Sequence, residues 1–169
     1  MSTAPILSES IDVRSFWSII GQRATGVTVV TAKGPEGPAG FLGFSASHVS
    51  ASPPLMLVSI DKKTSARSAV LDGRNFALNY LPAGARAIAE VFGGNSDLKG
   101  ANRFEPGPWS ELRTGAPVLI GALAAIDCVL EETIDRDGVS IMIGRVVATA
   151  VDLGRAPLIA FRGSYFDWP

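Results

Sequence analysis

The stretch Arg23-Ala-Thr-Gly-Val-Thr-Val-Val-Thr31 is followed by Gly40-Phe-Leu-Gly-Phe-Ser-Ala-Ser-His-Val-Ser50 and by Pro53-Pro-Leu-Met-Leu-Val-Ser-Ile-Asp61. Each segment is typical of a β-strand, because β-branched and other apolar residues dominate its centre. Hydroxyl side chains and glycines gather at the strand ends. A small β core with such strand ends can hold a phosphorylated cofactor without a metal ion or an acid/base pair.

The composition predicts one folded domain. The chain has 169 residues, of which 47% are hydrophobic and 18% are charged. This length suits one domain with its own core, and this composition argues against disorder. We therefore expect a flexible N-terminal segment at residues 1–10 and a single domain at residues 11–169. The formal net charge of -1 provides no positive field for a nucleic-acid partner.

His48 and Cys128 are the only histidine and the only cysteine in the sequence. Two such residues cannot build a usual zinc site, so we expect no metal. A single thiol excludes an internal disulfide and fits a reducing compartment, and Cys128 is expected to be a small buried hydrophobe. The sequence shows neither a signal-peptide pattern nor an apolar run long enough for a membrane span. We therefore expect a cytoplasmic protein without membrane contact.

Periodicity and turn residues predict the order of the secondary structure. Helices are expected at about Asp12–Arg23, Thr64–Leu71 and Ala85–Phe92. Strands are expected at about Val27–Ala32, Gly40–Ser47, Leu55–Ile60, Asn75–Leu81, Ala122–Ile134, Val139–Val151 and Leu158–Gly163. Asn95–Pro117 is expected to be a long loop with a short helical turn, and Trp17 is expected to lie in the core. The pattern predicts a mainly β fold, an antiparallel barrel of about six strands with a few flanking helices.

The strongest chemical pattern is a set of hydroxyls, glycines and lysines at the expected strand ends. Its members are Thr25-Gly26, Gly43, Ser45, Ser47, Ser50 and the run Lys62-Lys-Thr-Ser65. Hydroxyls, backbone N–H groups and lysines bind phosphate well, and the lysine run precedes an expected helix. Ordinary turn chemistry with solvated lysines stays open as an alternative reading. The sequence contains no P-loop and no dinucleotide-binding glycine fingerprint.

The order of the motifs resembles that of the short-chain flavin reductases, the reductase components of two-component flavin-dependent monooxygenases. The residues that carry the resemblance are Ala24–Thr31, Phe44–Ser47, Pro53–Val58, Lys63–Ser65, Phe76–Leu81, Ile143–Val146 and Pro157–Tyr165. The similarity extends from about Phe16 to Tyr165. The resemblance implies a homodimeric Greek-key split barrel that binds FMN or FAD. It also implies NADH or NADPH as hydride donor and a separate oxygenase that receives the reduced flavin.

The resemblance also implies which residues contact the cofactor. The flavin ring and ribityl chain are expected beside Ala24, Thr25, Gly26, Val27, Thr28, Gly43, Phe44, Ser45 and Ala46. The flavin phosphate is expected near Ser50, Lys63, Thr64 and Ser65. Phe92, Arg103 and Phe104 are expected to lie over the site or to come from the other subunit. No catalytic side chain is expected, because the two cofactors carry the hydride chemistry and the protein orients them.

The chain departs from the family pattern at the expected hairpin before residue 140. Many members carry Gly-Asp-His there, and their histidine is associated with the nicotinamide site. In this chain the matching residues are Asp137-Gly138-Val139, so Val139 occupies the histidine position. His48 and Tyr165 are the other candidates for the nicotinamide region, and for His48 an exposed turn position stays open as the alternative.

Two other functions stay open on the sequence alone. Val139 favours a flavin-binding protein or electron carrier without free-flavin reductase activity. The low fraction of charged residues also permits a non-enzymatic dimeric barrel that binds a partner protein or another small ligand. FMN and FAD remain alternatives, as do NADH and NADPH.

Overall fold

The computed structural model describes residues 11–168, and the predicted flexible segment at residues 1–10 lies outside them. The first part of the chain holds α1 (Val13–Ile20), β1 (Thr25–Gly26), β2 (Thr28–Gly34), β3 (Gly37–Leu42), β4 (Ser47–Ala51), β5 (Pro54–Asp61), α2 (Ala66–Gly73), β6 (Asn75–Tyr80) and α3 (Arg86–Phe92). The second part holds the 3-10 helix η1 (Gly100–Phe104), β7 (Trp109–Glu111), β8 (Pro117–Leu119), β9 (Ala124–Arg136), β10 (Val139–Val151), β11 (Leu158–Phe161) and β12 (Ser164–Asp167).

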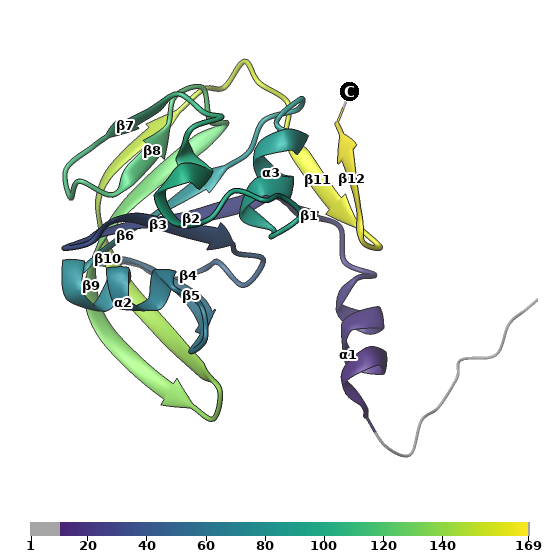
Figure 1. The fold of residues 1–169 in the computed structure, drawn as a ribbon, viewed down its shortest axis with the longest axis horizontal. Helices are drawn as coiled ribbons and strands as arrows, with labels where there is room; N and C mark the ends of the chain where they lie inside the picture. Colours follow the sequence, from purple (N-terminus) through teal and green to yellow (C-terminus); the bar gives the residue numbers. More distant parts are fainter. Residues whose placement is uncertain (1–10, 169) are drawn as a thin grey trace, which may run out of the picture.

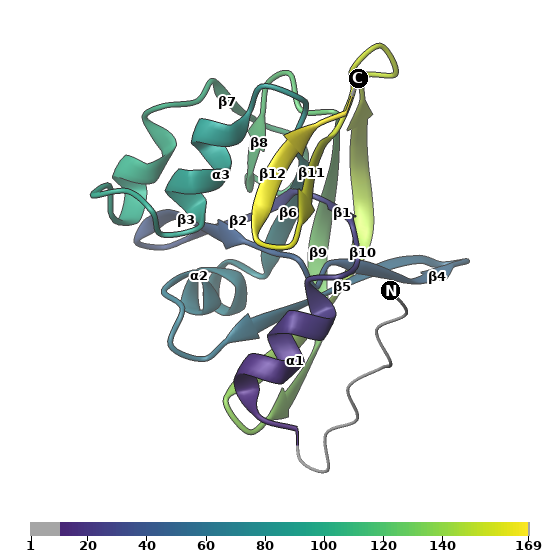
Figure 2. The same ribbon diagram turned by 90° about the vertical axis from the view of Figure 1, so that its right-hand side faces the viewer.

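The main sheet has seven strands in the order β3-β2-β6-β9-β10-β5-β4. Every pairing within it is antiparallel, and the long β9–β10 hairpin forms its centre. A three-stranded sheet β1-β11-β12 and the small β7-β8 pair complete the fold. Figures 1 and 2 show α2 and α3 packed near β2 and β3, whereas α1 lies beyond the turn that joins β11 to β12. The predicted mainly β class is confirmed.

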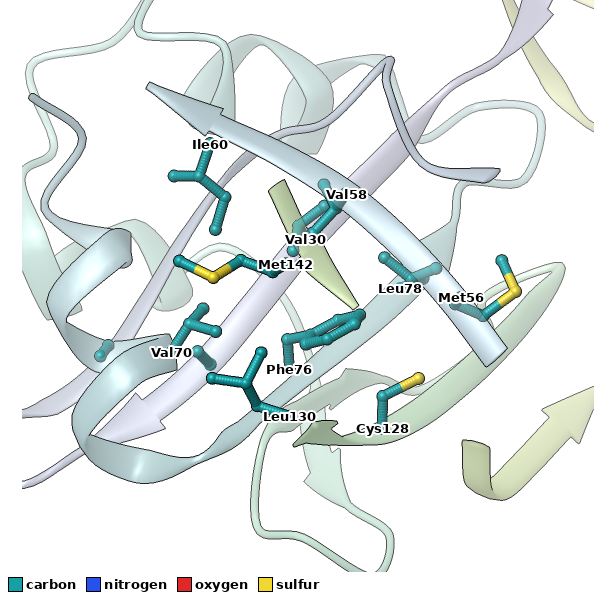
Figure 3. Close-up of a cluster of buried hydrophobic side chains, with 12 residues drawn as sticks. Val30, Met56, Val58, Ile60, Val70, Phe76, Leu78, Cys128, Leu130 and Met142 are labelled. Carbon is teal, nitrogen blue, oxygen red and sulfur yellow. The ribbon is translucent and has the colours of Figure 1, made fainter. Parts of the chain in front are cut away.

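Strand β2 separates two hydrophobic clusters. Its residues from Thr28 to Ala32 are all buried, and alternate side chains point to opposite faces of a strand. Val30 packs in a cluster with Val58, Phe76 and Met142, which Figure 3 shows. Val29 packs in the other cluster, below α3. A strand buried on both faces explains why this stretch contains no charged residue.

Several predicted boundaries are wrong. The expected strand Gly40–Ser47 is two strands, β3 and β4, with an irregular link between them. The expected loop Asn95–Pro117 contains η1 and β7, and β8 begins at its last residue. The described residues contain strands up to β12, more than the expected six, because the short strands β1, β4, β7, β8 and β12 lack a clear alternating pattern.

The first helix is shorter than predicted. Asp12 is its N-cap, and the Asp12 carboxylate accepts a hydrogen bond from the Ser15 N–H at 2.7 Å. The helix ends at Ile20, before Gly21. None of its residues is buried, and the side chain of Trp17 is 62% exposed, so the expectation that Trp17 lies in the core is wrong.

Cys128 lies in the first cluster and is fully buried. Burial raises the pKa of its thiol to about 12, with a smaller contribution from the charge of Asp127. The thiol is therefore neutral at physiological pH, and Cys128 is the small buried hydrophobe that the sequence indicates. No helix in the part of the chain that the structure describes is long and apolar enough to cross a membrane.

A buried polar network joins β8 to the main sheet. The Asn79 side chain is fully buried and accepts a hydrogen bond from the Leu119 N–H at 2.8 Å. Its amide donates to the Val29 carbonyl oxygen at 3.3 Å and to the Thr31 hydroxyl at 3.2 Å. The Thr31 hydroxyl in turn donates to the Pro117 carbonyl oxygen. Because each partner is buried, removal of the amide leaves several polar atoms without a hydrogen bond.

We predict that Asn79→Ala lowers the free energy of unfolding by about 2–4 kcal/mol, since buried unsatisfied groups cost about 1–3 kcal/mol each and a cavity adds to this. Urea denaturation followed by circular dichroism measures the change. The matched control is Asn95→Ala, because Asn95 is exposed and only its backbone N–H takes part in a hydrogen bond. Equal stability of the two variants would contradict the structural role of the network.

Candidate functional site

A groove of about 930 Å3 runs between α1 and the link from β3 to β4. It is lined by Phe16, Trp17, Ile19, Ile20, Arg23, Phe41, Leu42, Gly43, Phe44, Ser45, Ala46, Ser47, Ser59, Asp61, Thr64, Phe92, Gly93 and Val139. A smaller pocket of about 260 Å3 adjoins it and shares Trp17, Ile20, Arg23 and Phe44 with it. The groove has the size of a small-molecule site, for which volumes of about 300–1,000 Å3 are usual.

The floor of the groove is the irregular link between β3 and β4, and Gly43 is required at its start. A Cβ atom at this position would overlap the Cγ2 atom of Val30, which is fully buried. The Gly43 N–H donates to the Thr28 carbonyl oxygen at 2.8 Å, so the backbone stays tightly against β2 as it leaves β3. Only glycine allows this close approach.

A side chain replaces the strand ladder beyond Gly43. The Ser45 hydroxyl accepts a hydrogen bond from the Ser59 N–H at 2.9 Å and donates to the Ser59 carbonyl oxygen at 3.2 Å. It thereby satisfies both backbone groups of a β5 residue that has no strand partner on this side. The main sheet has no strand pairing of β3 with β4 among the described residues, and the groove opens at this interruption.

The walls of the groove are aromatic and aliphatic. Phe41 comes from β3, Phe44 comes from the floor, Phe16 and Trp17 come from α1, and Phe92 comes from the end of α3. Phe92 also packs edge-to-face against Phe104 and Trp109, which fixes its ring. Aromatic walls of this kind suit a planar, largely apolar ring system.

Polar groups also line the groove. Ser45, Ser47, Ser59 and Thr64 contribute hydroxyls, and Arg23 and Asp61 contribute charges. The Asp61 carboxylate accepts from the Lys63 N–H at 2.8 Å, and the Asp61 carbonyl oxygen accepts from the Thr64 N–H at 2.9 Å. These bonds form the turn that places Thr64 at the groove.

The β9–β10 hairpin holds this turn in place. The Lys62 N–H donates to the Gly138 carbonyl oxygen at 2.8 Å. The Asp135 carboxylate accepts from the Ser140 hydroxyl at 2.6 Å and lies 3.6 Å from the Lys62 ammonium nitrogen. The Ser140 hydrogen bond, followed by the Lys62 and Arg67 charges, holds the pKa of Asp135 below its usual value. Val139 and Thr64 therefore lie at the same end of the groove.

The structure brings together part of the predicted cofactor set. Seven of the predicted residues line the groove, namely Gly43, Phe44, Ser45, Ala46, Thr64, Phe92 and Val139. Thr25 and Tyr165 line the smaller pocket with Phe44. Burial raises the pKa of the Tyr165 hydroxyl, with a smaller contribution from the nearby charge of Glu90.

Other predicted residues lie outside both linings. Val27 is buried in the core below α3, and Thr28 is buried in β2. The remaining exposed ones are Ala24, Gly26, His48, Lys63 and Ser65. His48 lies on β4 opposite Met56. The binding roles of these residues stay predictions.

Arg103 and Phe104 contact residues next to the groove but do not line it. The Arg103 guanidinium donates to the Leu98 carbonyl oxygen at 3.3 Å and to the Gly40 carbonyl oxygen at 3.4 Å. Phe104 packs against Phe92 and Trp109. Neither residue lines the groove of its own chain, so within one chain both act through Phe92 and β3.

The strand register separates Ser50 from the lysine run. Ser50 pairs with Leu55 at the start of β5, whereas Lys63 follows Asp61 at its end. The strand between Leu55 and Asp61 spans about 20 Å at about 3.3 Å per residue. The expectation that Ser50 and Lys63 lie near one phosphate is therefore not met within one chain, because a phosphate is far smaller than this distance.

Sequence reasoning missed the contribution of α1 and of one arginine. Phe16, Ile19 and Ile20 line the groove beside Trp17, and Arg23 lines both pockets. One signal was available, because apolar residues at neighbouring helix positions such as Ile19 and Ile20 cannot all face a single core. Arg23 opens the very stretch that predicts the fold, but nothing in the local pattern shows which way its side chain points.

The groove fits the flavin nucleotide that the resemblance implies. Aromatic walls offer stacking partners for a flavin ring, and the hydroxyls with Arg23 offer hydrogen bonds to a hydroxylated, anionic tail. The described residues contain no group of three or more histidine, cysteine or acidic side chains arranged to hold a metal ion.

Comparisons with known proteins agree with this reading. The family model described as flavin reductase like domain matches residues 20–169. The FMN reductase (NADH) RutF of Ancylobacter novellus is 38% identical over 139 residues, which cover 82% of this chain and 76% of the relative. HsaB of Rhodococcus jostii, the reductase subunit of a flavin-dependent monooxygenase, is 32% identical over 160 residues, which cover 95% of this chain and 80% of HsaB.

A solved structure supports the fold. The NADH:FAD oxidoreductase SgcE6 of Streptomyces globisporus superposes with a TM-score of 0.88 at 26% identity, over 99% of each chain. The split-barrel architecture that the sequence resemblance implies is thereby confirmed.

We predict that Gly43→Ala destabilises the fold by about 1–3 kcal/mol, because the added methyl group overlaps Val30 and the backbone has to shift. Thermal unfolding measures the effect. Gly138→Ala is the matched control, since a Cβ atom at Gly138 meets nothing within 4 Å and the backbone there has no positive φ. A Gly43→Ala variant as stable as Gly138→Ala would show that the floor of the groove tolerates a side chain.

Proposed function

The chain belongs to the flavin reductase like domain family, and on that premise we propose that it is an NAD(P)H-dependent flavin reductase. In this proposal it binds FMN or FAD and transfers hydride from a reduced nicotinamide to the flavin. The observation that carries the proposal is the groove at the interruption between β3 and β4, where aromatic walls and hydroxyls meet. One relative is named FMN reductase (NADH), and one similar solved structure is named NADH:FAD oxidoreductase. These names support a flavin as one cofactor and NADH as the other.

The residues of the groove have distinct tasks in this proposal. A bound flavin supplies the redox chemistry by accepting a hydride at ring nitrogen N5. Phe44 and Trp17 pack against its ring, while Ser47 and Thr64 donate hydrogen bonds to its polar tail. Arg23 provides a positive charge for an anionic group. These contacts hold the ring in one orientation, which is the main task when the reactive groups belong to the cofactors.

The groove contains no acid/base pair of the usual kind. Arg23 and Asp61 are its only charged residues, and neither histidine nor cysteine lines it in the described part of the chain. Direct hydride transfer needs no proton relay, so this composition supports the proposed reaction. Val139 is the proposed neighbour of the nicotinamide, where its apolar side chain excludes water but donates no hydrogen bond.

The reduced flavin is proposed to serve a separate oxygenase. HsaB is named as the reductase subunit of a flavin-dependent monooxygenase, and its similarity extends over 95% of this chain. A groove open to solvent supports this role, because a reduced flavin that is handed on has to leave its site.

A homodimer is proposed on the exposure of α1. Helices shorter than about 12–15 residues are marginal alone in water, and α1 has 8 residues with none of them buried. Its exposed side chains include Val13 and Trp17, and the adjacent Ile11 is also exposed. A second copy that covers this apolar face would stabilise the helix and form part of the groove.

The reductase prediction is tested by adding FMN or FAD to the purified protein and following the loss of NADH or NADPH absorbance. We expect oxidation that depends on both protein and flavin. Tight flavin binding without any oxidation would contradict the reductase and favour a flavin-binding protein or electron carrier. Failure to bind either flavin would contradict the site itself.

In titrations of the purified protein with flavin, Thr64→Val is expected to weaken FMN binding about tenfold or more. The reason is that a hydrogen bond to a charged group contributes about 1.5–3 kcal/mol. Binding of riboflavin, which lacks the phosphate, should be unchanged. Thr149→Val is the matched control, since Thr149 is exposed on β10 and lies outside the groove lining. Equal loss of FMN and riboflavin affinity would place Thr64 away from the phosphate.

The dimer prediction concerns Val13, which is 75% exposed and lies outside both pocket linings. We expect the unaltered protein to sediment as a dimer and Val13→Glu to raise the dimer dissociation constant at least tenfold, because a carboxylate is costly to bury unpaired. Ser18→Glu, on another face of the same helix, is the control. A protein that sediments as a monomer at micromolar concentration would contradict the proposed dimer.

A further inference from the structure

The Ser45 hydroxyl stands where the next backbone pair of the main sheet is expected. Ser47 pairs with Leu57 in the β4–β5 ladder, and the same antiparallel register continued by two residues sets Ser45 opposite Ser59. The ladder ends before that pair. The Ser45 hydroxyl instead accepts from the Ser59 N–H at 2.9 Å and donates to the Ser59 carbonyl oxygen at 3.2 Å. One side chain thus replaces a strand backbone, and we call these two hydrogen bonds the Ser45 latch.

The latch limits what the Ser45 hydroxyl can offer to a ligand. A serine hydroxyl has one proton, and in Ser45 this proton is donated to the Ser59 carbonyl oxygen. The carbonyl and phosphate oxygens of a flavin nucleotide are acceptors, so they need a donor. Although Ser45 lines the groove, it can donate to them only by leaving the Ser59 carbonyl oxygen without its partner.

Phe44 lies between the latch and a second fixed point. On one side, the Gly43 N–H donates to the Thr28 carbonyl oxygen at 2.8 Å, and the backbone of Gly43 passes too close to Val30 for a Cβ atom. On the other side, the Ser45 latch ties the chain to β5. The Phe44 side chain is 40% exposed and lines both pockets. A ring with so little burial depends on its backbone for its orientation, and the two neighbouring residues fix that backbone.

From this arrangement we propose that Ser45 is a positioning residue for the flavin ring, which acts through Phe44 and not by its own contact with the cofactor. The latch holds the link from β3 to β4 in the position at which the Phe44 ring packs against the flavin ring. The inference rests on the proposed function, in which Phe44 is a wall for that ring. It replaces the cofactor contact expected for Ser45 from the sequence with support of a neighbouring contact residue.

The first test measures hydrogen exchange of the Ser59 amide by NMR in the flavin-free protein. We expect Ser45→Ala to speed this exchange about tenfold or more, because the N–H loses its acceptor and is open to water. Ser45→Thr keeps the hydroxyl and should keep the slow exchange. Ser68→Ala is the matched control, since the Ser68 hydroxyl is exposed, donates to the Ser65 carbonyl oxygen and lies outside both pockets. Equal Ser59 exchange in Ser45→Ala and Ser68→Ala overturns the latch.

The second test compares binding of FMN and of riboflavin, which has the same ring but no phosphate. We expect Ser45→Ala to raise both dissociation constants by the same factor, about three- to tenfold, and Ser45→Thr and Ser68→Ala to leave them within about twofold. A role in stability alone would change Ser59 exchange but not these affinities, and this result overturns the positioning role. A loss confined to FMN also overturns it, since the hydroxyl then acts on the phosphate.

A double-mutant cycle separates support of Phe44 from direct contact with the flavin. If Ser45 acts through Phe44, adding Ser45→Ala to Phe44→Ala changes riboflavin affinity by less than about twofold, because no ring remains to be positioned. If the hydroxyl touches the flavin itself, the double variant shows the product of the two single losses, and this outcome overturns the proposal. Failure of both flavins to bind the unaltered protein contradicts the proposed function, whereas the Ser59 exchange still decides whether the latch exists.

Discussion

The residues from Thr28 to Ala32 on strand β2 are withdrawn from solvent on both faces. Each face therefore needs its own apolar cover, and the two hydrophobic clusters, beneath α2 and beneath α3, provide it. The same burial leaves polar atoms that only protein groups can satisfy, which is why Asn79 and Thr31 form a network with β8. Helices α2 and α3 and the small β7-β8 pair occupy the places that the double burial of one strand requires.

The site lies where β3 ends and the sheet is interrupted. At Gly43 the backbone passes so close to Val30 that a side chain would not fit. The backbone of Ser59 on β5 then takes its hydrogen bonds from the Ser45 side chain instead of from a neighbouring strand. The link between β3 and β4 is thus left without strand pairing at the place where it lines the groove.

The sequence predicts the regular parts of this fold better than the site. Alternation and β-branched residues identify β2, β6, β9 and β10, because burial imposes those patterns directly. The break at Gly43 depends on a contact with Val30, and the separation of Ser50 from Lys63 depends on strand register, neither of which is local. The contact of the β11–β12 turn with the chain just beyond α1 is not local either, because the Arg162 N–H donates to the distant Gly21 carbonyl oxygen.

The exposed helix α1 contributes to both pockets. Its residues form one wall of both pockets, yet no residue of α1 is buried, and the turn at Arg162 meets the chain just beyond its C-terminal end. If a second copy covers α1, as proposed, the free energy of association stabilises the wall against which the ligand packs. Ligand binding and association then strengthen each other, because anything that favours the ordered helix favours both. In such a dimer the affinity of the groove for its cofactor would depend on protein concentration, which a rigid monomeric pocket would not show.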